Sequence, residues 1–148
     1  MEESLDLFKI VKDAYEIHDI DLKTYSPLTL AYIGDAVYDM VIRTRLVTVA
    51  NTQVNKLHKR ASKLVNAGAQ ATMITALLED LTEEELQVYK RGRNAQAVTK
   101  AKNASMKDYR TATGFEALIG YLYLNQETER MLELIDKGLH LAELLEEN

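Results

Sequence analysis

The 148-residue chain contains no cysteine, one proline and six glycines, and its formal net charge is −5 at pH 7. A chain of this length can bury about two-thirds of its unfolded surface without disulfides or a structural metal. The lack of cysteine excludes a disulfide framework and a thiolate metal site, and no apolar run is long enough to cross a membrane. We therefore expect one domain over residues 1–148, a cytoplasmic location and no membrane partner.

The composition and the spacing of apolar residues predict an all-α fold of about six to seven helices. No alternating apolar-polar run with turn residues indicates a sheet. Ser4 can cap a first helix that fades around His18-Asp19, and a linker follows over 19–25. Further helices are expected from Pro27 to about Leu46, from Asn51 or Thr52 to Ala67-Gly68, from Ala69 to about Glu79, from Thr82 to Gly92, from Ser105 through Glu116, and from Gln126 to about Leu145.

The helix expected from Pro27 places a carboxylate among apolar residues. Asp35 lies off the predicted buried stripe, and the adjacent Gly34 leaves room for another backbone or a ligand to approach closely. A solvated Asp beside a helix-packing glycine fits the pattern equally well. The predicted stripe repeats at spacings of three and four and consists of Leu30, Ile33, Val37, Met40, Val41 and Thr44, while Ala31, Tyr38 and Asp39 share the side of Asp35.

Basic residues gather in the second half of the chain despite its acidic total. Thr82 and Glu85 form a capping-box pattern, and the helix that it opens is expected to end at Gly92 in the left-handed conformation. The polar segment 93–104 has no apolar stripe and is expected to be a loop. A basic stripe can contact phosphates, although a solvated basic loop is the commoner outcome. From residue 90 to 110, seven basic residues stand against the acid Asp108: Lys90, Arg91, Arg93, Lys100, Lys102, Lys107 and Arg110.

The segment from Ser105 carries the second carboxylate of interest. Thr113 followed three residues later by Glu116 matches a capping box, in which case Glu116 only opens a helix. Ser105 and Asp108 offer an earlier start, which leaves Glu116 in mid-helix. Only the fold can bring Asp35 and Glu116 together, and their repulsion would then raise the proton affinity of one of them until a bound cation relieves it.

Two blocks of the sequence resemble the two catalytic helices of the ribonuclease III family. They are residues 30–36 (LAYIGDA) and residues 115–124 (FEALIGYLYL), in the order usual for the family. Together with Lys90-Arg91-Gly92-Arg93-Asn94 and Tyr109-Arg110, they resemble the short branch that lacks a double-stranded-RNA-binding domain. The resemblance covers nearly the whole chain and implies a ribonuclease III-like endonuclease domain.

The resemblance also implies a Mg²⁺-dependent endoribonuclease that cleaves double-stranded RNA and matures the 23S ribosomal RNA precursor. Asp35 and Glu116 would be the catalytic and metal-binding residues, and metal-activated water would leave 5′-phosphate and 3′-hydroxyl ends. Magnesium prefers hard oxygen ligands and keeps waters, so one or two carboxylates with a substrate phosphate can suffice.

The sequence departs from the usual family pattern at its other acidic positions. Leu28, Ala31 and Thr113 stand where other members carry acids, and near one more such position the chain offers only Gln53 and Asn55. Two carboxylates remain, which favours one ion per site or a second ion recruited with the substrate. Whether Asp39 or Asn55 supports the metal stays open.

Without a separate RNA-binding domain, the catalytic domain itself would hold the duplex. The resemblance places Tyr32 at a two-fold interface and implies a homodimer, although a lone tyrosine on a helix is more often part of the core. Two other functions remain compatible with the sequence: a non-catalytic RNA-binding module, and a helical protein-interaction adaptor that uses the acidic C-terminal helix. The candidate RNA-contacting residues are Lys90, Arg91, Arg93, Asn94, Lys102 and Arg110.

Overall fold

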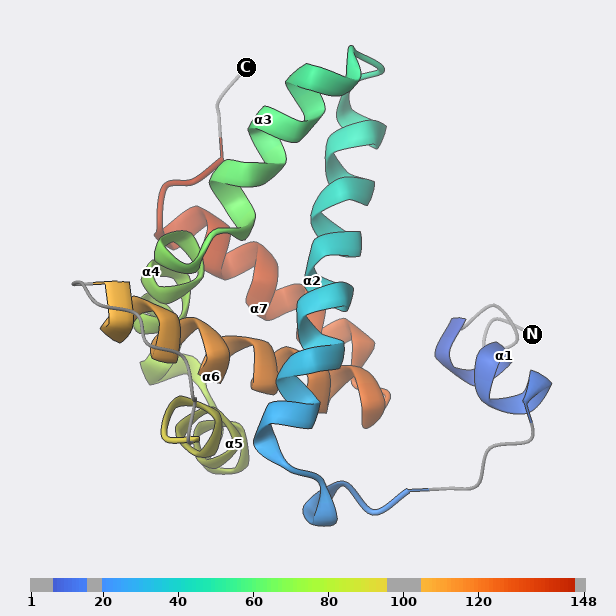
Figure 1. Cartoon of the computed structure of the whole chain (residues 1–148), viewed down its shortest axis with the longest axis vertical. Coiled ribbons are helices and arrows are strands. Elements are labelled where there is room, and N and C mark those ends of the chain that lie inside the picture. Colours follow the sequence, from blue (N-terminus) through green and yellow to red (C-terminus); the bar gives the residue numbers. More distant parts are fainter. Residues whose placement is uncertain (1–6, 16–19, 96–104, 146–148) are drawn as a thin grey trace.

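The structure is a computed structural model that describes residues 7–15, 20–95 and 105–145. Within these ranges the chain forms seven α-helices and no strand, which confirms the all-α prediction (Figure 1). In the same ranges, no helix is long and apolar enough to cross a membrane. The helices are α1 (Leu7–Ala14), α2 (Pro27–Val49), α3 (Val54–Val65), α4 (Ala67–Leu77), α5 (Glu83–Arg93), α6 (Ser105–Leu124) and α7 (Thr128–Leu141), with short 3₁₀ turns at Leu22–Thr24 and Leu78–Asp80.

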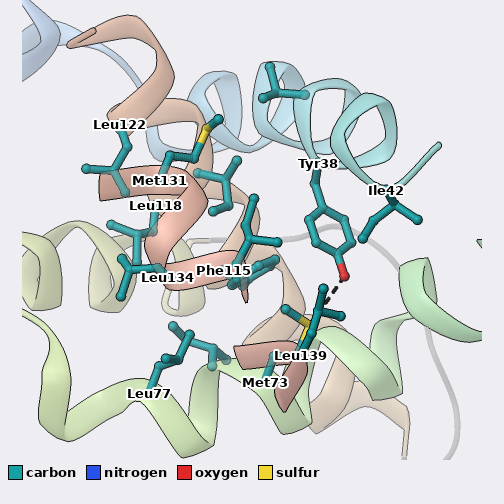
Figure 2. Close-up of a cluster of buried hydrophobic side chains, with 14 of the residues drawn as sticks. Tyr38, Ile42, Met73, Leu77, Phe115, Leu118, Leu122, Met131, Leu134 and Leu139 are labelled. Carbon is teal, nitrogen blue, oxygen red and sulfur yellow. Dashed lines mark hydrogen bonds between the residues drawn. The ribbon is translucent and has the colours of Figure 1, made fainter. Parts of the chain in front are cut away.

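Helix α6 is the centre of the bundle because it packs against α2, α4, α5 and α7 (Figure 1). Phe115, Leu118 and Leu122 of α6 are fully buried. They meet apolar side chains of α2, α4 and α7 in one continuous core (Figure 2). Helix α1 lies at the periphery, where Phe8 makes an edge-to-face contact with Tyr123.

Tyr38 links four helices inside this core. Its hydroxyl donates to the carbonyl of Leu64 in α3 at 2.6 Å. The same hydroxyl lies 3.3 Å from the sulfur of Met73 in α4 (Figure 2). Its ring packs edge-on against Phe115 in α6, with ring centroids 5.3 Å apart. Burial raises the pKa of Tyr38, so the hydroxyl stays protonated. Since Phe115 directly precedes Glu116 along α6, this contact supports the acid-bearing part of the bundle from within.

The buried face of α2 differs from the predicted stripe. Met40 is 47% exposed, Thr44 is exposed, and Ile33 and Val41 are half-buried. The face is rotated because α6 approaches on the side of the small residues, which the spacing of three and four along α2 did not indicate. The residues that α2 buries are Leu30, Ala31, Gly34, Val37, Tyr38 and Ile42.

Local signals predicted helix starts better than helix ends. The Thr82 capping box is confirmed, since its hydroxyl accepts from the Glu85 N–H while the Glu85 carboxylate accepts from the Thr82 N–H. The left-handed end at Gly92 is wrong: this glycine lies within α5, packed closely against Gly114 of α6.

Several other predicted boundaries move by a few residues. The break expected at Ala67-Gly68 lies at Asn66, so α4 begins at Ala67 rather than at Ala69. Helix α3 begins at Val54 rather than at residue 51 or 52, because α2 continues to Val49 and an extended connection follows. Helix α7 is shorter than predicted, because left-handed residues stand before and after it at Gln126 (φ 58°) and Glu143 (φ 56°). The predicted cap Ser4 and most of the predicted basic loop lie outside the described residues.

A shielded ion pair joins α5 to α7. Both side-chain oxygens of Glu85, a side chain only 6% exposed, accept from the Arg130 guanidinium at 2.8 Å. Arg130 also donates to the carbonyl of Asp80 at 2.8 Å. The hydrogen bonds from Arg130 to Glu85 are the main reason that the pKa of Glu85 lies below its usual range. The start of α5 is therefore fixed by a charge pair as well as by its cap.

Candidate active site

Two glycines let α2 and α6 touch backbone to backbone. A Cβ at Gly34 would overlap the carbonyl oxygen of Glu116, and a Cβ at Gly120 would overlap the carbonyl oxygen of Leu30. Asp35 follows Gly34, and Glu116 stands one helical turn before Gly120. Both carboxylates therefore emerge at the same crossing, and the close backbone approach predicted at Gly34 is confirmed.

The structure brings Asp35 and Glu116 together. Asp35 is exposed, Glu116 is partly buried in the middle of α6, and their carboxyl groups lie within hydrogen-bonding reach. The capping-box alternative for Glu116 is wrong, because Thr113 lies inside the helix and donates to the carbonyl of Tyr109 at 2.9 Å. Burial, and then the nearby Asp35 carboxylate, raise the pKa of Glu116 to about 8.

The acid pair opens into a pocket of about 440 Å³ between α2 and α6. Asp35 and Glu116 supply its carboxylates, and most of the other side chains around them are apolar or aromatic. This environment strengthens the interaction of the two acids with each other and with any cation. The lining residues are Leu28, Ala31, Tyr32, Ile33, Asp35, Ala36, Tyr109, Thr113 and Glu116.

The donor set suits a hard divalent cation that keeps part of its water shell. The described residues contain no cluster of three or more His, Cys, Asp or Glu side chains able to hold a metal. Two adjacent carboxylates of which one is exposed leave positions free for water and a phosphate oxygen, as Mg²⁺ requires. Asp39 instead pairs with Arg43 at 3.1 Å, and neither it nor Asn55 lines the pocket.

The predicted RNA-contacting residues that the structure describes do not line this pocket. They stand at the end of α5 and near the start of α6, and the end of α5 packs on the turn of α6 that carries Glu116. Gly92 packs against Gly114 and Ala117, so the basic end of α5 is held against that turn. Lys90, Arg91, Asn94 and Arg110 are exposed, whereas Arg93 is half-buried with its guanidinium 5.6 Å from the centre of the Tyr89 ring. Arg91 donates to the carbonyl of Tyr25 at 3.4 Å, and Arg93 to the side chain of Asn94 at 3.2 Å. Lys102 lies outside the described residues.

Tyr32 is 81% exposed, which rules out the alternative that it belongs to the core of this chain. Leu28 stands one turn earlier on α2 and is 41% exposed, and Tyr109 lines the same pocket at 40% exposure. An apolar cluster of this kind beside a polar site is typical of a surface that another molecule covers.

Two residues of the site, Gln70 and Gly120, were not predicted from the sequence. Gln70 lies on α4, and its side-chain amide faces Glu116 and favours the charged carboxylate. A lone glutamine among the Ala, Met and Ile residues of this helix was the available signal. Gly120 was quoted only as part of a motif, because its role depends on the crossing with α2.

A family model and a solved structure show which class of protein this chain belongs to. The family model of the Ribonuclease III domain matches residues 28–127. A protein of Fusobacterium nucleatum with a known crystal structure superposes with a TM-score of 0.69 at 30% identity, covering 78% of this chain and 93% of that protein. The fold and the sequence therefore define a ribonuclease III-like endoribonuclease.

Individual relatives show which branch of this class the chain belongs to. The chain is 51% identical to Mini-ribonuclease 3 of Clostridium tetani over 129 residues, covering 86% of this chain and 85% of the relative. It is 52% identical to Mini-ribonuclease 3 of Enterococcus faecalis over 118 residues, covering 78% and 89%. The chain thus belongs to the ribonuclease III family, in its Mini-ribonuclease 3 branch, as the sequence resemblance predicted.

Proposed function

We propose that this endoribonuclease depends on Mg²⁺ and cleaves double-stranded RNA, with Asp35 and Glu116 as its catalytic and metal-binding pair. The observation that carries the proposal is the meeting of the two carboxylates at an open pocket. Burial raises the pKa of Glu116 most, and the nearby Asp35 carboxylate, with no cation between the two acids, raises it further. Binding a divalent cation would relieve that repulsion.

Asp35 and Glu116 would have different roles because their side chains differ in exposure. A bound Mg²⁺ would supply a hydroxide near neutral pH and neutralise charge on the phosphate. Asp35, the exposed acid, would be the more accessible to solvent and substrate, while the partly buried Glu116 would be the more fixed of the two. Attack by water on phosphorus would break the P–O3′ bond, leaving 5′-phosphate and 3′-hydroxyl ends without use of the RNA 2′-hydroxyl.

The duplex would be held by the end of α5 and the start of α6. The basic and polar candidates Lys90, Arg91, Arg93, Asn94 and Arg110 stand at the end of α5 and near the start of α6, and Gly92 of α5 packs on the turn that carries Glu116. We include Lys102 in this set as a prediction. Their positive charge would bind the phosphates of an A-form duplex, whose shallow minor groove suits recognition by shape.

We also propose a homodimer in which Tyr32 and its apolar neighbours are covered by a second copy. Two equivalent sites facing one duplex could cut both strands, with the stagger set by the two-fold symmetry. The 23S ribosomal RNA precursor is the proposed natural substrate, which would place the protein in the cytoplasm.

Cleavage of duplex RNA tests the proposal directly. Wild type, Asp35→Asn and the control Asp39→Asn are incubated with duplex RNA, with and without Mg²⁺. We expect cleavage by wild type and the control, only with Mg²⁺, and none by Asp35→Asn. Binding without cleavage by all three would instead indicate an RNA-binding module, and no duplex binding at low salt would indicate a protein adaptor.

A further inference from the structure

A third helix reaches the acid pair through a buried amide. Gln70 of α4 is 1% exposed, and α4 packs directly against α6. Its Nε2 donates to the carbonyl of Val65 at 3.2 Å, and the same amide faces the Glu116 carboxyl. Glu116 is thus approached by Asp35 at the exposed pocket and by Gln70 from the interior.

The orientation of the amide follows from its neighbours. Turning the side chain over would place Oε1 against the carbonyl oxygen of Val65, where two acceptors repel each other. With Nε2 on Val65, one N–H bonds that carbonyl and the other is available to Glu116. The Val65 carbonyl therefore fixes the donor that Glu116 meets.

This arrangement has a cost that packing does not explain. Among the described residues, Gln70 Oε1 is the only buried side-chain nitrogen or oxygen without a hydrogen-bond partner. Leaving such a group buried and unpaired destabilises the folded chain. Met73 and Ile74 on the same helix are buried without any such cost, and a methionine would match the shape of Gln70. A buried polar group kept at a cost beside a functional pair indicates a role at that pair.

We propose that Gln70 is a positioning residue: its amide holds the Glu116 carboxylate in one orientation, so that Glu116 and Asp35 present their oxygens to one divalent cation. This inference rests on the proposed metal-dependent function. It adds an uncharged contact from α4 to a site that has only two carboxylates. Removing a group that orients a metal ligand in this way lowers metal affinity about 10- to 100-fold.

Manganese binding without RNA tests the role of Gln70. Free Mn²⁺ is counted by electron paramagnetic resonance during titration of wild type, Gln70→Met and the control Gln53→Met, which changes an exposed glutamine in the same way. We expect Gln70→Met to bind Mn²⁺ about 10-fold more weakly or worse, and the control to match wild type. Loss of stability should be small, because the variant also removes the unpaired oxygen.

The outcomes separate the inference from the proposed function. Equal Mn²⁺ affinity in wild type and Gln70→Met would overturn the positioning role while leaving the metal-dependent function intact. No Mn²⁺ binding by wild type would overturn the proposed function, and the inference with it.

A second measurement does not depend on the folding of Gln70→Met. The side-chain NH₂ signals of Gln70 are followed by ¹⁵N NMR in wild type and in Glu116→Gln. We expect these signals to move in Glu116→Gln and to move in wild type when Mg²⁺ is added. Signals that stay in place in both experiments would show that the amide does not hold Glu116.

Discussion

Glu85 is buried and Glu116 is partly buried, and the structure shifts their pKa values in opposite directions. Glu85 faces the Arg130 guanidinium, and hydrogen bonds from it lower the pKa of Glu85. Glu116 faces another acid, and burial together with Asp35 raises its pKa to about 8. The charge of Glu85 is compensated within the chain, while the charge of Glu116 is not.

This contrast separates a structural carboxylate from a functional one. Glu85 joins the start of α5 to α7, and its surroundings favour the ionised form at neutral pH. Glu116 is held where its ionised form is unfavourable until something else brings positive charge. Carboxylates in that condition mark binding and catalytic sites more often than carboxylates in satisfied pairs.

The largest expected effect comes from separating Asp35 and Glu116 without touching either. In Gly34→Ala, the new Cβ would overlap the backbone of Glu116, so α2 and α6 must move apart. We expect a loss of about 3 kcal/mol or more in the free energy of unfolding, and loss of RNA cleavage. Urea unfolding followed by circular dichroism measures the first. In the control Gly68→Ala, the Cβ would meet only side-chain atoms, the nearest at 3.3 Å. Equal stability of the two variants would contradict a backbone-to-backbone crossing.

Breaking the ion pair between Glu85 and Arg130 tests whether the charge of Glu85 is compensated within the chain. Arg130→Met leaves the Glu85 carboxylate shielded and unpaired, so we expect a loss of about 2 kcal/mol in the free energy of unfolding near neutral pH. The control Arg43→Met breaks an exposed pair with Asp39 and should cost about 0.5 kcal/mol or less. Similar losses in both variants would show that Glu85 is as well solvated as a surface acid.

The direction of the pH effect follows from the lowered pKa of Glu85. Its contribution to stability is present above the usual carboxyl value of 4.5 and is lost as the pH falls through the lowered pKa. Acid titration of wild-type stability by urea unfolding measures this loss.

Helix starts and the acid pair could be predicted from the sequence because their signals are local or carried by motifs. The Thr82 capping box, Pro27 at the start of α2 and Glu116 in mid-helix are all as predicted. Gly34 was identified as a place of close approach from its small size beside Asp35.

The sequence could not show which face of α2 is buried, because that depends on where α6 crosses it. Tyr38 and Ala31 are buried on the side assigned to Asp35, since small residues admit a neighbouring helix. Gln70 was missed for the same reason: nothing near it in sequence indicates that α4 passes beside Glu116. Such contacts are tertiary and leave no periodic pattern.

The Tyr38 hydroxyl is a buried polar group whose hydrogen bond is made within the chain, in contrast to the acid pair. Tyr38→Phe removes its hydroxyl and leaves the carbonyl of Leu64 without this bond, so we expect a loss of about 1.5 kcal/mol in the free energy of unfolding. The control Tyr15→Phe changes a tyrosine that is 76% exposed and should have no measurable effect. Urea unfolding decides between them, and a neutral Tyr38→Phe would mean that the hydroxyl is not part of what holds α2, α3 and α4 together.

The smallest expected effect is a gain in stability, in the variant Glu116→Gln. Since the pKa of Glu116 is about 8 in the folded chain, against 4.5 for an ordinary glutamate, the folded state binds this proton more tightly than the unfolded state. The contribution of Glu116 to stability is therefore full below pH 4.5 and is lost as the pH rises towards 8. Glu116→Gln removes that loss, so we expect it to be about 1 kcal/mol more stable than wild type near pH 8.5 and no more stable near pH 5. Thermal unfolding of both proteins, with the exposed Glu79→Gln as control, measures the difference.

Added Mg²⁺ should raise the melting temperature of wild type and not that of Glu116→Gln, because only wild type retains both acids. A Glu116→Gln variant less stable than wild type at alkaline pH would show that the ionised Glu116 already has a compensating partner within the chain, and the contrast with Glu85 would then disappear.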